Sequence, residues 1–326
     1  MRILFICPNW AGLATPIIKE MISQGHDVTH LDHDDFSDFS YFNGVHRTLA
    51  KLYQLVAKDN YKHRYTRLEI KRTISSFFIS RESFDVVLMT EPNLFNIDEL
   101  SMFKEHCNMM IATLWDSVAK SSNNIENLNL FDIIYSYDQE DCNKYGFEKI
   151  NNYLDPSWCS NSPLSDAKYD VFSIMSFTKE RYKMLLDFLD KNPHLTHKIY
   201  MFIDHDRKRK YIKDPRVKIT KNLILGDELK QCIEGAKAIL DLLQGHQTGL
   251  SFRVYESLGY KRKLITTNEC IKNYDIYNED NVFIIDGNNV VPRSFLQSEY
   301  SKLSNGILDK YMLSSWVNKV LNNIDN

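Results

Sequence analysis

Short apolar runs alternate with amphipathic segments along the first half of the chain. The first run covers residues 2–7, a loop with Pro8 and Gly12 ends it, and residues 15–24 then show helical spacing. A second apolar run at 28–31 completes a strand–helix–strand unit, which predicts a parallel sheet. The pattern recurs in three later runs, residues 84–89, 109–114 and 130–136. The first half is therefore expected to be a doubly wound α/β domain.

The segment from His33 to about Arg81 interrupts this alternation. It is rich in charged and aromatic residues, and its apolar positions at 53–57 and 68–74 recur at helical spacing. We expect helices there.

A second α/β series follows residues 151–168, whose prolines, serines and asparagines are typical of a linker. Strands are predicted at 169–175, 198–203, 217–220, 236–243, 263–266 and 281–286, with helices in most of the gaps. Two domains of roughly 150 residues suit a chain of 326 residues. Ligands of such sheets bind at the carboxyl ends of the strands, so the active site is expected in a cleft between two Rossmann-like domains.

The expected boundaries are 1–155 for the N-terminal domain, 165–305 for the C-terminal domain and 306–326 for a final helix. Apolar residues form one stripe along residues 310–323, which predicts that this helix packs on a partner. We expect it to return to the N-terminal domain. The stripe consists of Tyr311, Leu313, Trp316, Val317, Val320 and Leu321.

Charge and cysteine usage limit the partners of the chain. The formal net charge is −3, which gives no overall field for nucleic acid. The densest basic run, residues 206–210, is interpreted as solvated, with contact to lipid headgroups or phosphates as the less favoured alternative. Six cysteines without C-x-x-C spacing suggest reduced thiols and a cytoplasmic protein. No apolar stretch reaches the roughly 18 residues of a membrane span, so any membrane contact is expected to be peripheral.

Residues 241–259 carry the strongest chemical signal, because an apolar strand leads into a glycine-containing loop and then a helix. Backbone N–H groups at such a helix start bind phosphate without a metal. The expected donor-binding residues are His246, Gln247, Thr248, Gly249, Leu250, Ser251, Arg253 and Glu256.

Within that set, Gly249, Leu250 and Ser251 would offer their N–H groups to phosphate. Arg253 would clamp phosphate oxygens while Glu256, on the same helical face, accepts both hydroxyls of a ribose. The alternative for this pair is a plain surface ion pair. His246 is a candidate for contacting the sugar or the diphosphate, with a structural hydrogen bond as its alternative.

The run His246 to Asn268 resembles the donor-site signature of bacterial GT-B glycosyltransferases, through Arg253-Val-Tyr-Glu-Ser-Leu-Gly259 and Lys261-Arg-Lys-Leu-Ile-Thr-Thr-Asn268. More narrowly, it is similar to enzymes of lipopolysaccharide or capsule biosynthesis. Leu114-Trp-Asp-Ser117 and residues 131–141 resemble the N-terminal motifs of the same group.

The resemblance implies the GT-B fold and transfer of a sugar from a nucleotide sugar to a surface glycan such as lipopolysaccharide, O-antigen or capsule. The nucleotide would bind the C-terminal domain, and a glycan or lipid-linked glycan acceptor the N-terminal one. Glu256 matches the ribose-binding carboxylate of the family. Many retaining enzymes carry a second glutamate eight residues earlier, where this chain has Thr248. Inversion is therefore favoured.

An inverting enzyme needs a general base near the acceptor hydroxyl, and we expect it from the N-terminal half. Asp116 follows one predicted strand, and Glu91 and Asp138 follow two others. Each of the three has helix N-capping as its alternative.

Metal and cofactor sites are not expected. Asp32-His-Asp-Asp35 and Asp204-His-Asp206 resemble the D-x-D of metal-dependent glycosyltransferases, but that motif belongs with a different fold. The nucleotide sugar would be a substrate and not a cofactor. Two alternative functions remain: a nucleotide-sugar 2-epimerase, and a non-catalytic GT-B subunit that binds nucleotide and scaffolds a partner.

Overall fold

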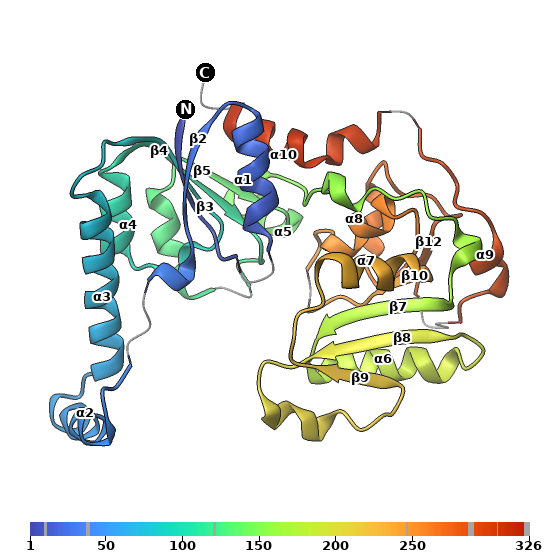
Figure 1. Cartoon of the computed structure of the whole chain (residues 1–326), viewed down its shortest axis with the longest axis horizontal. Coiled ribbons are helices and arrows are strands. Elements are labelled where there is room, and N and C mark those ends of the chain that lie inside the picture. Colours follow the sequence, from blue (N-terminus) through green and yellow to red (C-terminus); the bar gives the residue numbers. More distant parts are fainter. Residues whose placement is uncertain are drawn as a thin grey trace. The chain divides into compact units, whose positions relative to one another are not determined.

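The computed structural model describes residues 1–9, 12–36, 40–119, 122–245, 247–285, 290–304 and 306–322 (Figure 1). The chain forms two compact units. The first contains Met1–Ser136 with Lys144–Glu148, and the second contains Tyr137–Asn143 with Lys149–Asn322. Each unit is built around one sheet.

The first sheet has the strand order β2-β1-β3-β4-β5-β6, and the pairings from β2 through β5 are parallel. This confirms the doubly wound arrangement predicted from the apolar runs. The two-residue strand β6 is too short to leave a pattern in the sequence. The strands are β1 (Arg2–Ile6), β2 (Asp27–Leu31), β3 (Phe84–Met89), β4 (Cys107–Leu114), β5 (Ile133–Ser136) and β6 (Glu148–Lys149).

Helices flank this sheet, and the two predicted in the segment 33–81 are present. Helix α3 packs its buried face, Ile70, Ile74 and Phe78, against sheet residues such as Leu4 and Val87. The helical elements of the chain up to β6 are α1 (Ala14–Ser23), η1 (His33–Asp35), α2 (Gly44–Ala57), α3 (Tyr61–Phe78), η2 (Pro92–Leu94), α4 (Ile97–Lys104), η3 (Ser122–Leu130) and α5 (Gln139–Tyr145), of which α5 lies mostly in the second unit.

The second sheet is parallel throughout, with the order β12-β11-β10-β7-β8-β9. All six strands predicted for this half are present. β10 ends at Asp241, two residues earlier than expected, because the chain turns there into the glycine-containing loop. The strands are β7 (Tyr169–Ser176), β8 (His197–Phe202), β9 (Val217–Thr220), β10 (Ala236–Asp241), β11 (Lys263–Thr266) and β12 (Val282–Ile284).

Helices and short 3-10 turns connect these strands. η6 coincides with the basic run 206–210, which is largely exposed as predicted. The elements are η4 (Pro156–Trp158), η5 (Leu164–Asp166), α6 (Lys179–Lys191), η6 (Asp206–Tyr211), α7 (Gly226–Glu234), α8 (Phe252–Gly259), η7 (Glu269–Asn273), α9 (Arg293–Gln297), η8 (Leu308–Tyr311) and α10 (Leu313–Leu321).

The last helix, α10, buries the predicted apolar stripe, including Trp316 and Val317. The Trp316 ring meets Tyr153 edge to face at 5.6 Å, and the ammonium of Lys319 donates to the carbonyl of Lys149 at 2.6 Å. The chain therefore returns to residues 149–154, which lie inside the expected N-terminal range 1–155 and belong to the second unit of the structure.

The basic triplet Lys261-Arg-Lys263 of the family-like run has structural partners. Arg262 is buried, and its guanidinium donates to the carbonyls of Ile233 and Glu234 at the end of α7. Burying a charge this way requires such acceptors. No helix in the described ranges is long and apolar enough to cross a membrane.

Candidate functional site

The candidate site lies at the carboxyl edge of the second sheet, where Asp241 ends β10. The Asp241 carboxylate is buried and accepts from the hydroxyl of Ser251 at 3.0 Å and from that of Thr266 at 3.3 Å. Ser251 is the N-cap of α8 and accepts from the N–H of Arg253 at 3.2 Å. Asp241 thus fixes the start of α8 against the ends of β10 and β11.

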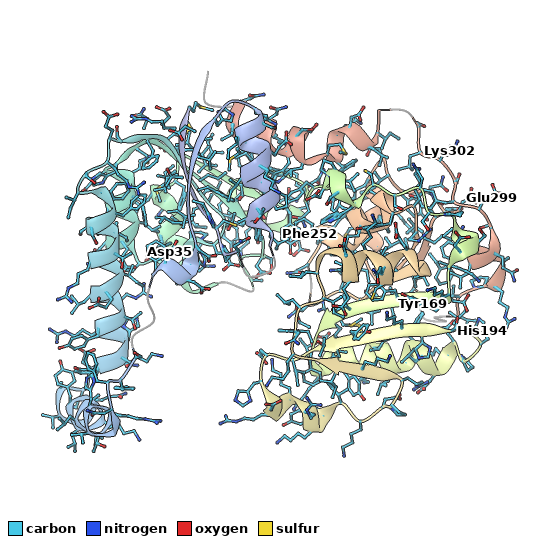
Figure 2. All side chains as sticks on the ribbon, in the orientation of Figure 1. Asp35, Tyr169, His194, Phe252, Glu299 and Lys302 are labelled. Atoms are coloured by element: carbon cyan, nitrogen blue, oxygen red, sulfur yellow. The ribbon has the colours of Figure 1, made fainter. Side chains whose placement is uncertain are left out.

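Ring packing supports the same helix start. Phe252, the first residue of α8, is labelled in Figure 2 and meets the rings of Tyr153 at 5.2 Å and Trp158 at 6.0 Å, both edge to face. Such contacts favour one ring orientation over others. The first turn of α8 is therefore held in place by both polar and aromatic contacts.

Gly249 is required by the shape of the loop before α8. A Cβ atom at this position would lie 2.2 Å from Cδ2 and 2.4 Å from the carbonyl oxygen of Tyr137, so no other residue fits without a shift of the backbone. The carbonyls of Gly249 and Leu250 accept from the amides of Asn268 at 3.0 Å and Asn152 at 2.9 Å. These contacts fix the peptide planes of the loop.

The N–H groups of Gly249, Leu250 and Ser251 are hydrogen-bonded to none of the described residues. These are the groups that were expected to bind phosphate. N–H groups without a partner at the start of a helix attract anions, so these three N–H groups are available to bind phosphate.

Thr248, in contrast, has its polar groups engaged. Its N–H and hydroxyl donate to the carboxylate of Asp138 at 2.8 and 2.9 Å. Asp138 is 2% exposed and also accepts from the N–H groups of Glu140 at 2.9 Å and Asp141 at 3.4 Å at the start of α5. Asp138 therefore fits the helix-cap alternative, and it joins the loop to α5 within the second unit.

Arg253 and Glu256 form an ion pair inside α8. Glu256 is only 2% exposed, so the alternative of a plain surface pair is wrong. Burial raises the pKa of the Glu256 carboxyl to about 7; Arg253 opposes that rise and Asp241 adds to it. A ribose can reach the Glu256 carboxylate only if the side chains that cover it move. Arg253 is one of these side chains, because it forms the ion pair with Glu256.

Arg181 was not found by sequence reasoning. It lies in the first turn of α6, which Thr178 caps, and its guanidinium donates to the carbonyl of Ser176 at the end of β7, at 3.4 Å. Its Nε atom is buried and lacks a hydrogen-bond partner in the described structure. Burial lowers the pKa of Arg181, and Asp241 is the nearby charge that opposes this.

The signal for Arg181 was present in the sequence. Residues 169–181 repeat the strand–loop–helix pattern of residues 236–253, with Thr178 at the cap position in place of Ser251. Each helix has an arginine in its first turn. Comparing the two patterns would have placed both arginines at one sheet edge.

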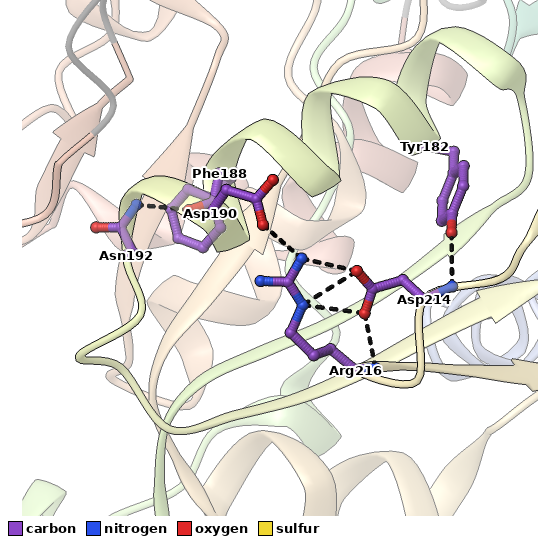
Figure 3. A network of polar contacts seen from close by, with 6 residues as sticks. All are labelled: Tyr182, Phe188, Asp190, Asn192, Asp214 and Arg216. Atoms are coloured by element: carbon purple, nitrogen blue, oxygen red, sulfur yellow. Dashed lines mark hydrogen bonds and ion pairs between the residues drawn. The ribbon is translucent and has the colours of Figure 1, made fainter.

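Arg216 shows what a structurally satisfied arginine looks like in the same unit (Figure 3). Its Nε donates to Asp214 at 2.9 Å, and its Nη2 donates to Asp214 at 2.7 Å and Asp190 at 2.6 Å. These two carboxylates raise the pKa of Arg216. Arg181 differs because it keeps a buried donor without an acceptor, which an anionic ligand would satisfy.

Two of the three predicted bases lie at the carboxyl edge of the first sheet. Glu91 follows β3, has no side-chain capping bond, and places its carboxylate 3.9 Å from Nδ1 of His33. Asp116 follows β4 and is partly exposed. Residues 117–119, directly after Asp116, are not helical.

The remaining members of the predicted donor set are Gln247, half-buried in the loop, and His246, which lies outside the described residues. The structure thus brings Gln247 to Ser251, Arg253 and Glu256 together on one loop and helix. Glu91 and Asp116 belong to the other sheet.

The aspartates of both D-x-D sequences have local partners. Asp32 and Asp35 form the capping box of η1, and Asp204 and Asp206 pair with Lys208 and Lys221, each at 2.9 Å. Within the ranges that the structure describes, no group of three His, Cys, Asp or Glu side chains is placed to hold a metal.

Comparisons with known proteins identify the fold. No protein-family model matches the sequence, and no curated protein sequence matches it. An alpha-glucosyltransferase solved in complex with UDP and a 13-mer DNA containing a central A:G mismatch is similar in structure, with a TM-score of 0.58 and 14% identity over 98% of this chain and 95% of that chain.

The glycosyltransferase VinC in complex with dTDP also matches, with 9% identity over 100% of this chain and 95% of that chain. Its TM-score is 0.41. The likeness to the alpha-glucosyltransferase, together with two parallel six-stranded sheets, shows that the chain has the GT-B glycosyltransferase fold.

Proposed function

We propose that the chain is a nucleotide-sugar-dependent glycosyltransferase that transfers a sugar to a bacterial surface glycan, without a metal and with inversion. The observation that carries this proposal is the carboxyl edge of the second sheet. There, open N–H groups of a helix start lie beside two arginines, Arg181 and Arg253, whose charges both act on Asp241. The GT-B fold supplies the architecture.

The donor diphosphate is the ligand that this edge suits best. Its charge would be stabilised by the N–H groups of Gly249 to Ser251, by the α8 dipole and by the two guanidinium groups. When Arg253 turns to the phosphate, it releases Glu256, whose carboxylate then accepts from the ribose hydroxyls. UDP in the similar alpha-glucosyltransferase supports a nucleoside diphosphate of this kind.

The acceptor and the stereochemistry rest on the sequence. The resemblance of residues 114–117 and 131–141 to lipopolysaccharide and capsule enzymes supports a glycan or lipid-linked glycan acceptor. Thr248 stands where many retaining enzymes have a glutamate, and its hydroxyl is bonded to Asp138. Inversion with Asp116 as the general base therefore fits better than retention.

A panel of nucleotide sugars tested by thermal shift examines the proposed function. One donor should raise the unfolding temperature, since a ligand at 100 times its dissociation constant adds about 2.7 kcal/mol to the stability. Turnover with that donor and a glycan acceptor should follow. No shift with any nucleotide would overturn the proposal, and conversion of the donor to its 2-epimer without an acceptor would favour the epimerase alternative.

Chelation tests the proposal that sugar transfer needs no metal ion. Turnover should persist after exhaustive treatment with EDTA, because arginines and N–H groups balance the diphosphate charge. Activity that is lost and then restored by Mg²⁺ or Mn²⁺ would show that this proposal is wrong.

A further inference from the structure

The hairpin formed by α2 and the first half of α3 exposes an unusual number of apolar side chains. More than half of the large apolar side chains exposed in the described structure lie between residues 42 and 68: Phe42, Val45, Leu49, Leu52, Leu55, Val56, Tyr65 and Leu68. Grouped exposure of this kind marks an interaction surface, whereas scattered single residues do not.

Four of these residues form a stripe along α2. Val45, Leu49, Leu52 and Val56 are spaced by four, three and four positions, which places them on one helical face. Their exposed fractions range from 53% to 86%. In an ordinary surface helix such a stripe faces the core, and here it faces solvent.

A different face of α2 packs against α3. Nε2 of His46 lies 3.0 Å from the hydroxyl of Tyr61, and Arg64 donates to the hydroxyl of Tyr53 at 2.8 Å. Ala50, at 3% exposure, is the one buried residue of α2. Polar and aromatic contacts with α3 therefore fix the orientation of α2, and this orientation exposes the stripe.

The other half of α3 anchors the hairpin to the first unit. Arg67 pairs with the buried Glu99 of α4 at 2.7 Å, and Lys71 pairs with Asp98 at 2.7 Å. In Figure 1, α2 lies at the end of α3 that is farther from the first sheet. The stripe is thus presented on a projecting and firmly held element.

The charge of the hairpin identifies its partner. In a chain with a net charge of −3, residues 44–66 carry one acidic residue, Asp59. Their five basic residues are Arg47, Lys51, Lys58, Lys62 and Arg64. A second copy of the chain fits poorly, because two basic hairpins repel each other. Nucleic acid would match the charge but would leave the stripe in water.

An anionic bilayer accepts both features, because it takes up apolar side chains and presents negative headgroups. We propose that the α2–α3 hairpin docks the protein on an anionic lipid surface, with Phe42 and the α2 stripe inserted among the headgroups and the basic residues around them. The inference does not depend on the proposed transferase activity.

Vesicle co-sedimentation of the full chain tests the proposal. The protein should bind vesicles of phosphatidylcholine with phosphatidylglycerol, should bind pure phosphatidylcholine at least tenfold less, and should be released by salt. The double substitution Leu49→Glu with Leu52→Glu should lower binding at least tenfold. Ile22→Glu is the matched control, because Ile22 on α1 is 54% exposed and lies outside the hairpin.

A second pair of variants separates specific charge from overall charge. Arg47→Glu with Lys51→Glu should weaken vesicle binding at least fivefold. The same reversal in η6, Arg207→Glu with Lys210→Glu, should change it less than twofold.

Melting curves establish that each variant is folded, and the nucleotide thermal shift shows independently whether the donor site works. Vesicle binding that survives in folded Leu49→Glu/Leu52→Glu protein would overturn the proposal. A dimer, or a complex with DNA, that these substitutions abolish while vesicles are never bound would overturn it as well.

Discussion

The carboxyl edges of the two sheets have opposite chemistry, although the strand order differs only at one end of each sheet. At the second edge, the charges of Arg181 and Arg253 act on the buried carboxyl of Asp241, and Arg253 is also paired with the buried Glu256. At the first edge, Glu91 and Asp116 are partly exposed. A parallel sheet determines where a ligand meets the protein, and the side chains that follow each strand determine whether that place binds an anion or accepts a proton.

The largest effect is expected at the first edge. Asp116→Asn keeps the size of the side chain and removes its basicity, so turnover should fall by at least about a hundredfold while donor affinity changes little. Steady-state kinetics and nucleotide binding in the same variant provide the measurement. Glu91→Gln is the matched variant, and we expect it to retain most of the activity. Near-native turnover of Asp116→Asn would transfer the role to Glu91.

The next effect concerns the second edge. Glu256→Ala removes the carboxylate that would accept from the ribose, which should weaken nucleotide binding by about 1.5–3 kcal/mol. Calorimetric titration measures the affinity, and melting curves establish that the variant is folded. If a folded variant binds every nucleotide as tightly as the natural protein, Glu256 is not part of the site.

A comparison of two arginines sharpens the electrostatic argument. Arg181→Met should lower nucleotide affinity about tenfold, since a charge-assisted contact to phosphate is lost. Arg216→Met should leave affinity unchanged and lower stability, because Arg216 pairs with Asp190 and Asp214. Equal affinity losses in both variants would mean that the effect arises from general destabilisation.

The smallest effect is on stability and follows from the raised pKa of Glu256. A carboxyl with an ordinary pKa of 4.5 that rises to about 7 on folding stays protonated in the folded state where it ionises in the unfolded state. Its contribution to stability is complete below 4.5 and is lost as the pH rises through about 7. Between pH 8 and pH 6 the protein should therefore gain about 1 kcal/mol from this group.

Denaturant unfolding at the two pH values measures this gain, and Glu256→Gln serves as the reference because it cannot titrate. The difference between the two proteins should shrink as the pH falls. A natural protein and a Glu256→Gln variant with identical pH profiles would show that the carboxyl is not perturbed in this way.

Much of the architecture followed from the sequence. Buried parallel strands are continuous apolar runs, so eleven predicted runs correspond to strands, from residues 2–7 to 281–286, and the helices around residues 53–57 and 68–74 are present. Helix α8 after the glycine-containing loop was also predicted correctly, since strand, glycine and helix are local signals.

What the sequence could not show depends on contacts between distant residues. Asp138 bonds to Thr248 across 110 positions, and no local pattern encodes that pairing. The burial of Glu256 depends on its neighbours in space. The sequence predicted a carboxylate that accepts ribose hydroxyls directly, whereas in the structure other side chains cover it. The outward direction of the α2 stripe likewise required knowledge of which face of α2 packs on α3.

The fastening of the donor loop by Tyr137 and Asp138 limits how the chain can be divided. The Cα atom of Gly249 has room only for hydrogen beside Tyr137, and the N–H of Thr248 donates to Asp138. Both partners precede the linker at 151–168. A chimaera joined at that linker would combine the loop of one parent with residues 137 and 138 of the other parent, which contact it. Exchange of the second unit between proteins of this fold should succeed only at a junction before residue 137. The segment 137–143 then comes from the same parent as the loop that it contacts.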